Sequence, residues 1–195
     1  MSSDGGGISG AASGGQLEER IDLSVETDAK LTQAASLVGT GQLREALALL
    51  SALEKKCRVG NDTESLVRVC EASLQHCYDC HDYEQLILTL QTLATRRSQK
   101  TKAVKALVSK AIPWCLADSY TPIAVADTAQ KEFRDKLVVA LRDISDGKIF
   151  LELERARLTR ALANIKVLVL HLFGVGGGVG CLTLSLSSLL VPYDI

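Results

Sequence analysis

Between residues 28 and 166, apolar residues recur mostly at spacings of three and four along the chain. This spacing places them on one face of an α-helix, so the pattern predicts a series of amphipathic helices. Short turn-forming segments such as Gly39-Thr40-Gly41 and Gly60-Asn61-Asp62 separate successive apolar stripes. The helices expected from this pattern cover residues 28–39, 42–56, 62–77, 83–93, 98–112, 133–144 and 148–166.

The fold class follows from how these helices are connected. No part of the chain before residue 166 shows the sustained two-residue alternation that indicates strands. Residues 41–47 resemble residues 81–87, forty positions later, and each segment would open the second helix of a pair. One helical hairpin cannot bury its apolar faces alone, so hairpins with such a period stack. The sequence therefore predicts an all-α solenoid of antiparallel helical hairpins, similar to tetratricopeptide or HEAT repeats.

Several local signals refine the helix boundaries. Asn61 or Asp62 is a suitable N-cap for the third helix, and Ser98 for the fifth. Pro113 is expected to kink or end the fifth helix because it lacks a backbone N–H. Residues 119–127 are expected to form a loop or a short irregular helix.

Composition divides the chain into three segments. Residues 1–26 begin with a Gly/Ser-rich stretch, which predicts a disordered arm. Residues 27–166 form the helical-repeat arm. Residues 167–195 form an apolar, glycine-rich tail, which we interpret as a truncation or an alternative end.

The tail also permits a different interpretation. From Val167 to Tyr193 there is no Asp, Glu, Lys or Arg, and this length suffices to cross a bilayer. A tail-anchored, membrane-bound helical adaptor is therefore the alternative function. Against a membrane span, the glycine cluster at residues 174–180 weakens a helix, and no aromatic belt flanks the segment.

Charge and cysteine usage narrow the classes of partner and compartment. The chain carries 22 basic and 23 acidic residues, with a net charge of -1, which gives no electrostatic case for nucleic acid. The first fifteen residues contain no apolar core of a secretory signal, so the six cysteines are expected to be reduced thiols. We expect a cytoplasmic and nuclear protein.

One cysteine pattern raises the question of a cofactor. Cys77-Tyr-Asp-Cys80-His81 fits the C-x-x-C-H pattern of c-type haem attachment. The two cysteines could also bind zinc together with Cys70 and with either His76 or His81. Several of these residues also lie on the apolar stripe of a helix, where cysteine acts as a small hydrophobic side chain. We expect no cofactor, with haem or zinc as a remote alternative.

An acid-free basic run follows the fourth predicted helix. It could contact an acidic surface of a partner protein or phosphate, or form a solvated helix face. No aromatic residues are interleaved, which argues against stacking on single-stranded nucleic acid. The residues expected to contact a partner are Arg96, Arg97, Lys100 and Lys102, and the run continues to Lys105 and Lys110.

The seventh predicted helix carries charges that suggest structure rather than catalysis. Glu152 and Arg155, and likewise Glu154 and Arg157, lie three residues apart, a spacing that stabilises a helix. The three histidines are scattered, and no nucleotide-binding glycine motif is complete. We therefore expect a protein that is not an enzyme.

Three blocks carry a resemblance to a known family. They are Arg96-Arg97-Ser98-Gln99, residues 147–160, and more weakly residues 49–55. In this order they resemble the 26S proteasome non-ATPase regulatory subunit 12 family, over about residues 40 to 166. The residues of this family-like signature are Gly147, Lys148, Glu152, Glu154, Arg155 and Arg157.

The resemblance implies a function. Members of this family are lid subunits with an arm of helical repeats followed by a PCI module. The resemblance covers the arm only, so we expect the chain to lack the PCI module. It implies a non-catalytic scaffold in ubiquitin-dependent protein degradation, with other proteasome lid and core-particle subunits as partners.

Overall fold

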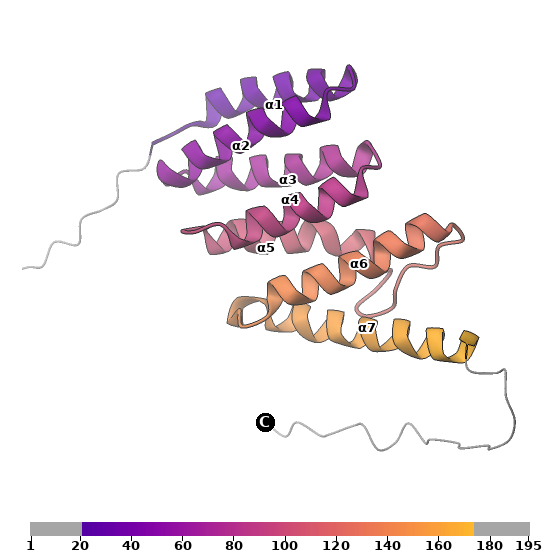
Figure 1. Cartoon of the computed structure of the whole chain (residues 1–195). Helices are drawn as coiled ribbons and strands as arrows, with labels where there is room; N and C mark the ends of the chain where they lie inside the picture. Colours follow the sequence, from indigo (N-terminus) through magenta and orange to yellow (C-terminus); the bar gives the residue numbers. More distant parts are fainter. Residues whose placement is uncertain (1–20, 174–195) are drawn as a thin grey trace, which may run out of the picture.

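The computed structural model describes residues 21–173, and this part of the chain is entirely helical apart from turns and one irregular loop (Figure 1). It confirms the all-α fold class. The elements are α1 (Ser24–Gly39), α2 (Leu43–Val59), α3 (Thr63–Asp79), α4 (Tyr83–Thr95), α5 (Thr101–Ala111), the 3₁₀ helix η1 (Ile112–Trp114), α6 (Thr128–Ser145), the 3₁₀ helix η2 (Ile149–Leu151) and α7 (Glu152–Phe173).

The helices pack as consecutive antiparallel pairs in a stack (Figure 1). In one layer α1 packs on α3, and α3 packs on α5, which contacts η2 at the start of α7. In the other layer α4 packs on α6. A continuous core of leucine, valine, alanine and cysteine side chains runs between the layers. This arrangement is that of a helical-repeat solenoid, as predicted.

The first three turns share one backbone conformation. Gly41, Asn61 and His81 have φ angles of 79°, 56° and 57°, in the left-handed region. Each is followed by the N-cap residue of the next helix. Glycine adopts this conformation without strain, and asparagine and histidine tolerate it better than most residues. The turns therefore recur every twenty residues. Each hairpin contains two such intervals, which explains why the sequence similarity between hairpins has a period of forty residues.

Core positions follow the same twenty-residue register. Ala46, Leu66 and Leu86 all have fully buried side chains. The next turn of each helix repeats this burial at Leu50, Cys70 and Leu90. One further turn along, Leu74 and Ala94 are buried, but α2 places Glu54 at this position. A carboxylate thus lies where the register calls for an apolar side chain.

The ordered stack begins earlier than the sequence indicated. The predicted disordered arm extended to residue 26, yet α1 starts at Ser24. Leu23 is buried, and its backbone N–H donates to the Asp62 carboxylate at 2.9 Å. Ile21 N donates to Gly60 O at 3.0 Å, so the segment is attached to the α2–α3 turn. The remainder of the predicted arm, residues 1–20, lies outside the described residues.

The capping predictions had mixed outcomes. Asp62 caps α3, because its carboxylate accepts from Ser65 N at 3.3 Å. The prediction that Ser98 caps the fifth helix is wrong. Ser98 has a φ of 61° within the α4–α5 turn, and α5 starts only at Thr101. Pro113 does end α5, which passes into η1 after Ala111.

The predicted loop lies between η1 and α6. Leu116 and Pro122 form an isolated antiparallel bridge, and the Asp118 carboxylate accepts from Tyr120 N and Thr121 N at 2.9 and 2.8 Å. These two backbone hydrogen bonds lower the pKa of Asp118.

The seventh helix continues past its predicted end. It begins after η2 and runs through residue 166 to Phe173 without interruption. The glycine cluster and the rest of the tail, residues 174–195, lie outside the described residues. Within residues 21–173, no helix combines the length and apolar character needed to cross a membrane.

Candidate functional site

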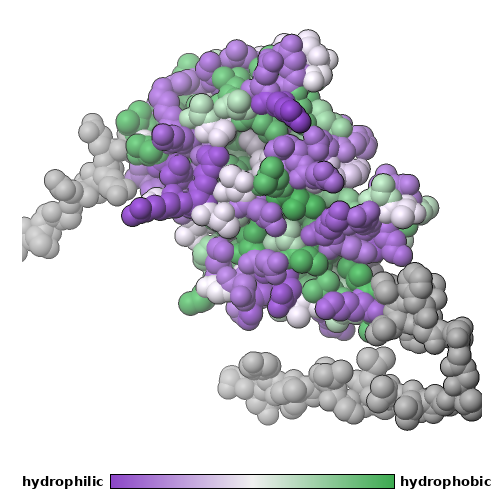
Figure 2. Space-filling model, viewed as in Figure 1, coloured by the Kyte–Doolittle hydropathy of each residue, from purple (hydrophilic) through white to green (hydrophobic). Residues whose placement is uncertain are grey.

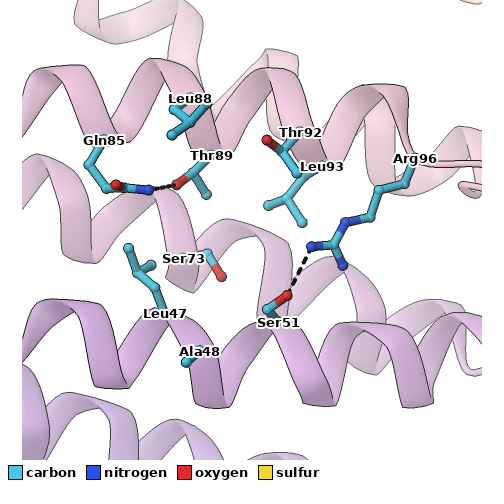
Figure 3. Close-up of a pocket in the computed structure, with 10 residues that line it drawn as sticks. All are labelled: Leu47, Ala48, Ser51, Ser73, Gln85, Leu88, Thr89, Thr92, Leu93 and Arg96. Atoms are coloured by element: carbon cyan, nitrogen blue, oxygen red, sulfur yellow. Dashed lines mark hydrogen bonds between the residues drawn. The ribbon is translucent and has the colours of Figure 1, made fainter.

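Arg96, the first residue of the predicted partner-contact set, turns back into the stack. It follows α4, and its guanidinium pairs with the Glu54 carboxylate of α2. The guanidinium also donates to Ser51 Oγ at 2.9 Å (Figure 3). Its charge is thereby compensated inside the chain. Arg96 thus joins the first hairpin to the second.

Glu54 is only 1% exposed and is surrounded by donors. Arg58 Nε and Gln99 Nε2 each donate to Glu54 Oε1 at 3.1 Å, and Arg96 pairs with Oε2. A buried carboxylate is tolerated only when it is paired and hydrogen-bonded, as it is here. We call Glu54, Arg58, Arg96 and Gln99 the Glu54 clamp.

The clamp also fixes the α4–α5 turn. Gln99 Nε2 donates to Leu93 O at 2.8 Å, and Gln99 Oε1 accepts from Lys100 N at 3.1 Å. Arg58 Nη1 donates to Arg97 O at 2.9 Å. The turn thus takes its conformation from side chains, which explains why Ser98 does not serve as the predicted cap.

Two of the family-like blocks therefore meet in space. Residues 49–55 contain Ser51 and Glu54, and residues 96–99 contain Arg96 and Gln99. Both blocks are visible in the sequence as family-like, but the burial of Glu54 is not predicted from it. The available signal was its position, four residues after Leu50 on the apolar stripe of its helix.

A groove lies beside the clamp, between α2 and α4 and over α3 (Figure 3). Its volume is about 250 Å³, and its sides carry short hydroxyl side chains and leucines. Gln85 donates to Thr89 Oγ1 at 3.1 Å, and Ser73 Oγ donates to Val69 O at 2.8 Å. These polar groups are satisfied internally. The lining residues are Leu47, Ala48, Ser51, Ser73, Gln85, Leu88, Thr89, Thr92, Leu93 and Arg96.

Three other basic residues of the run lie on the outside. Arg97, Lys102 and Lys105 are exposed, and α5 carries no acidic residue in its first turn. No carboxylate among residues 21–173 pairs with these three side chains. Lys100 is half-buried, and its backbone N–H donates to Gln99 Oε1 within the turn. The structure thus divides the predicted set: Arg96 belongs to the clamp, Lys100 is half-buried in the turn, and Arg97 and Lys102 are exposed.

The family-like signature builds the turn from α6 to α7. Gly147 has a φ of 67°, and Lys148 Nζ donates to Ile144 O. Arg155 pairs with Glu152 at 2.6 Å and contacts Asp146 at 3.5 Å.

The second pair expected in this helix does not form. In the described part of α7, Glu154 and Arg157 are half-buried and make no ion pair with each other. Leu151, Leu158 and Ala161 are fully buried, and they anchor the start of α7 to the core.

The cysteine pattern does not form a ligand set. Cys70 and Cys77 are fully buried, and burial raises the pKa of their thiols to about 12 and about 11. Cys80 and His81 are exposed beyond the end of α3. Among the described side chains, those of residues 21–167, no three His, Cys, Asp or Glu residues are grouped so that they could hold a metal ion.

An aromatic cluster joins the second hairpin to α6. The Tyr78 and Trp114 rings stack with centroids 4.4 Å apart, and the Tyr83 and Phe133 rings stack at 4.0 Å. A cavity of about 170 Å³ adjoins these rings. Beside it, buried Arg134 donates to Ile123 O at 2.7 Å and pairs with Asp135, so its charge is compensated too.

Comparison with known proteins places these features in one family region. The family model described as "PSMD12/CSN4, N-terminal" matches residues 45–168. This range starts within α2 and ends within α7, so it includes the Glu54 clamp, the groove and the α6–α7 turn.

Several curated proteins are similar to the chain. The 26S proteasome non-ATPase regulatory subunit 12 of Dictyostelium discoideum is 36% identical over 145 residues, which cover 74% of this chain and 30% of that protein. Homolog A of the same subunit in Arabidopsis thaliana is 31% identical over 127 residues, covering 65% and 26%. The 26S proteasome regulatory subunit rpn501 of Schizosaccharomyces pombe is 29% identical over 151 residues, covering 77% and 32%. The matches confirm the resemblance predicted from the sequence, and they span about a third or less of each relative.

Proposed function

The chain belongs to the PSMD12/CSN4 N-terminal family, and we propose that it acts as a non-catalytic scaffold arm of the proteasome regulatory-particle lid. The observation that carries this proposal is the family match over residues 45–168, which runs from within α2 to within α7. The relatives named as 26S proteasome regulatory subunits support the same assignment. In this role the arm contributes to ubiquitin-dependent protein degradation by holding other subunits in place.

The chemistry of the described side chains supports scaffolding. Arg96 and Arg134 have charged partners inside the fold, and the buried thiols are held in their neutral form by desolvation. Rigid, internally satisfied helices with long outer faces are suited to binding other proteins. The partners in this proposal are other lid subunits and subunits of the core particle.

The proposed location is the cytoplasm and nucleus. Cys57, Cys70, Cys77, Cys80 and Cys115 are free thiols. Free cysteines are typical of compartments where glutathione and thioredoxin keep thiols reduced.

Affinity purification of the full chain tests the proposal. The chain is expressed with a cleavable tag in cells, and the eluate is separated on a gradient and quantified by isotope-labelled mass spectrometry. We expect lid subunits to be enriched at least about tenfold over a tag-only control and to sediment with the chain. Recovery of the folded chain without any lid or core-particle subunit would overturn the scaffold role.

A further inference from the structure

The turn between α6 and α7 exposes three large apolar side chains. Ile149 is 91% exposed, Leu153 is 59% exposed and Phe150 is 37% exposed. They lie within five residues of one another, in the same segment that carries the family-like signature. Single exposed apolar residues are normal, whereas a group of this kind marks a contact surface.

An exposed basic surface lies next to this patch. Arg97, Lys102 and Lys105 project from the α4–α5 turn and α5, and α5 packs against η2, which contains Ile149 and Phe150. Figure 1 shows the α4–α5 and α6–α7 turns at the same edge of the stack, and Figure 2 shows strongly hydrophilic side chains projecting at the level of the α4–α5 turn.

The apolar patch and the basic surface together indicate the chemistry of a binding partner. Covering Ile149 and Leu153 requires apolar side chains, which a nucleic acid backbone does not supply. The carboxylates that flank the patch in the chain, Asp146 and Glu152, both pair with Arg155. The three basic side chains of α5 and the turn before it have no such partner among the described residues, so the edge favours carboxylates over a basic segment. Neighbouring helix axes lie about 8–10 Å apart, so a helix of about seven residues reaches from the apolar patch to the basic surface.

We infer that this edge binds an acidic segment of a partner protein that carries apolar anchor side chains. The apolar anchors pack on Ile149, Phe150 and Leu153, and the carboxylates face Arg97, Lys102 and Lys105. The inference rests on the proposed function only in expecting the segment to come from another proteasome subunit.

Photo-crosslinking tests the occupant directly. The full chain carries p-benzoylphenylalanine in place of Phe150, is irradiated in cells, and the crosslinked peptide is sequenced by mass spectrometry. We expect a peptide of net negative charge with at least one large apolar residue near the crosslink. Crosslinks to residues 174–195 of the chain itself, to lipid, to nucleic acid or to a basic segment would each overturn the inference, as would the absence of any crosslink.

The same experiment separates this inference from the proposed function. An acidic segment from a protein outside the proteasome, with no lid or core-particle subunit in the affinity eluate, would support the surface chemistry and contradict the scaffold role. A basic segment from a lid subunit would do the reverse.

A second experiment tests the same surface by substitution. Lys102→Glu with Lys105→Glu should reduce the yield of the acidic crosslink at least about tenfold, and so should Ile149→Ser. The matched controls are Lys131→Glu, an exposed lysine on α6, and Leu88→Ser, a 56% exposed leucine of the groove. Equal yields from test and control variants, with unchanged circular dichroism, would overturn the inference.

Discussion

The junction between α2 and α4 and the junction between α4 and α6 connect successive hairpins, but different chemistry holds each of them. At the first, the Glu54 clamp pairs a buried carboxylate with three donors, one from α2 and two from the α4–α5 turn, beside a groove of about 250 Å³. At the second, α4 packs directly on α6 and the Tyr83 and Phe133 rings stack at 4.0 Å.

The difference shows how one solenoid can join its repeats in two ways. Aromatic stacking depends mainly on buried area, so its contribution scales with the side chain removed. A buried ion pair depends on every partner being present, because an orphaned charge costs more than the pair contributes. The first junction should therefore be sensitive to which partner is lost, and the second to how much surface is lost.

The largest expected effect is at the aromatic junction. Phe133→Ala removes a ring that is 6% exposed and stacked on Tyr83, so it should lower the free energy of unfolding by about 3–4 kcal/mol. Urea denaturation followed by circular dichroism measures the loss. Phe150→Ala is the matched control: its ring is 37% exposed, so it should cost less than about 1 kcal/mol. Equal costs for the two variants would contradict the importance of the stack.

The clamp should show a smaller loss that a second substitution reverses. Arg96→Ala removes a charged hydrogen bond to Glu54 but leaves the donors Arg58 and Gln99 in place, so it should cost about 2 kcal/mol. Adding Glu54→Leu removes the under-compensated charge and restores the apolar side chain found at Leu74 in the register. The double variant should therefore be more stable than Arg96→Ala alone. If the two substitutions instead destabilise additively in a double-mutant cycle, the clamp does not act as a unit.

The clamp also marks the limit of what the sequence could predict. Apolar spacing predicted the helices because each stripe is a local pattern. The residues around Glu54 in the sequence indicate an ordinary surface acid, because its donors Arg96 and Gln99 lie 42 and 45 residues further along the chain. The prediction of Ser98 as an N-cap fails for the same reason. Contacts to the distant Glu54 determine the conformation of the turn that contains Ser98.

The turns show a different limit. The sequence shows the similarity between residues 41–47 and 81–87, but it does not show that the same turn also occurs midway, at Asn61. Gly41, Asn61 and His81 are three different residue types, yet all three adopt the left-handed conformation that the turn requires. The physical constraint therefore recurs every twenty residues while the residue type changes.

The smallest expected effect concerns the left-handed turn conformation, tested at Gly41 between α1 and α2. This turn lies before the α2–α4 and α4–α6 junctions in the chain. Gly41→Ala forces an alanine to a φ of 79°, and nothing lies within 4 Å of the added Cβ, so only the backbone strain remains. The substitution should cost about 1 kcal/mol. Gly39→Ala is the matched control two residues away: its Cβ also meets nothing within 4 Å, and its helical backbone favours alanine, so it should gain about 0.5 kcal/mol. Thermal and urea unfolding of the two variants should therefore shift in opposite directions, and equal shifts would show that the left-handed turn is not what sets the register.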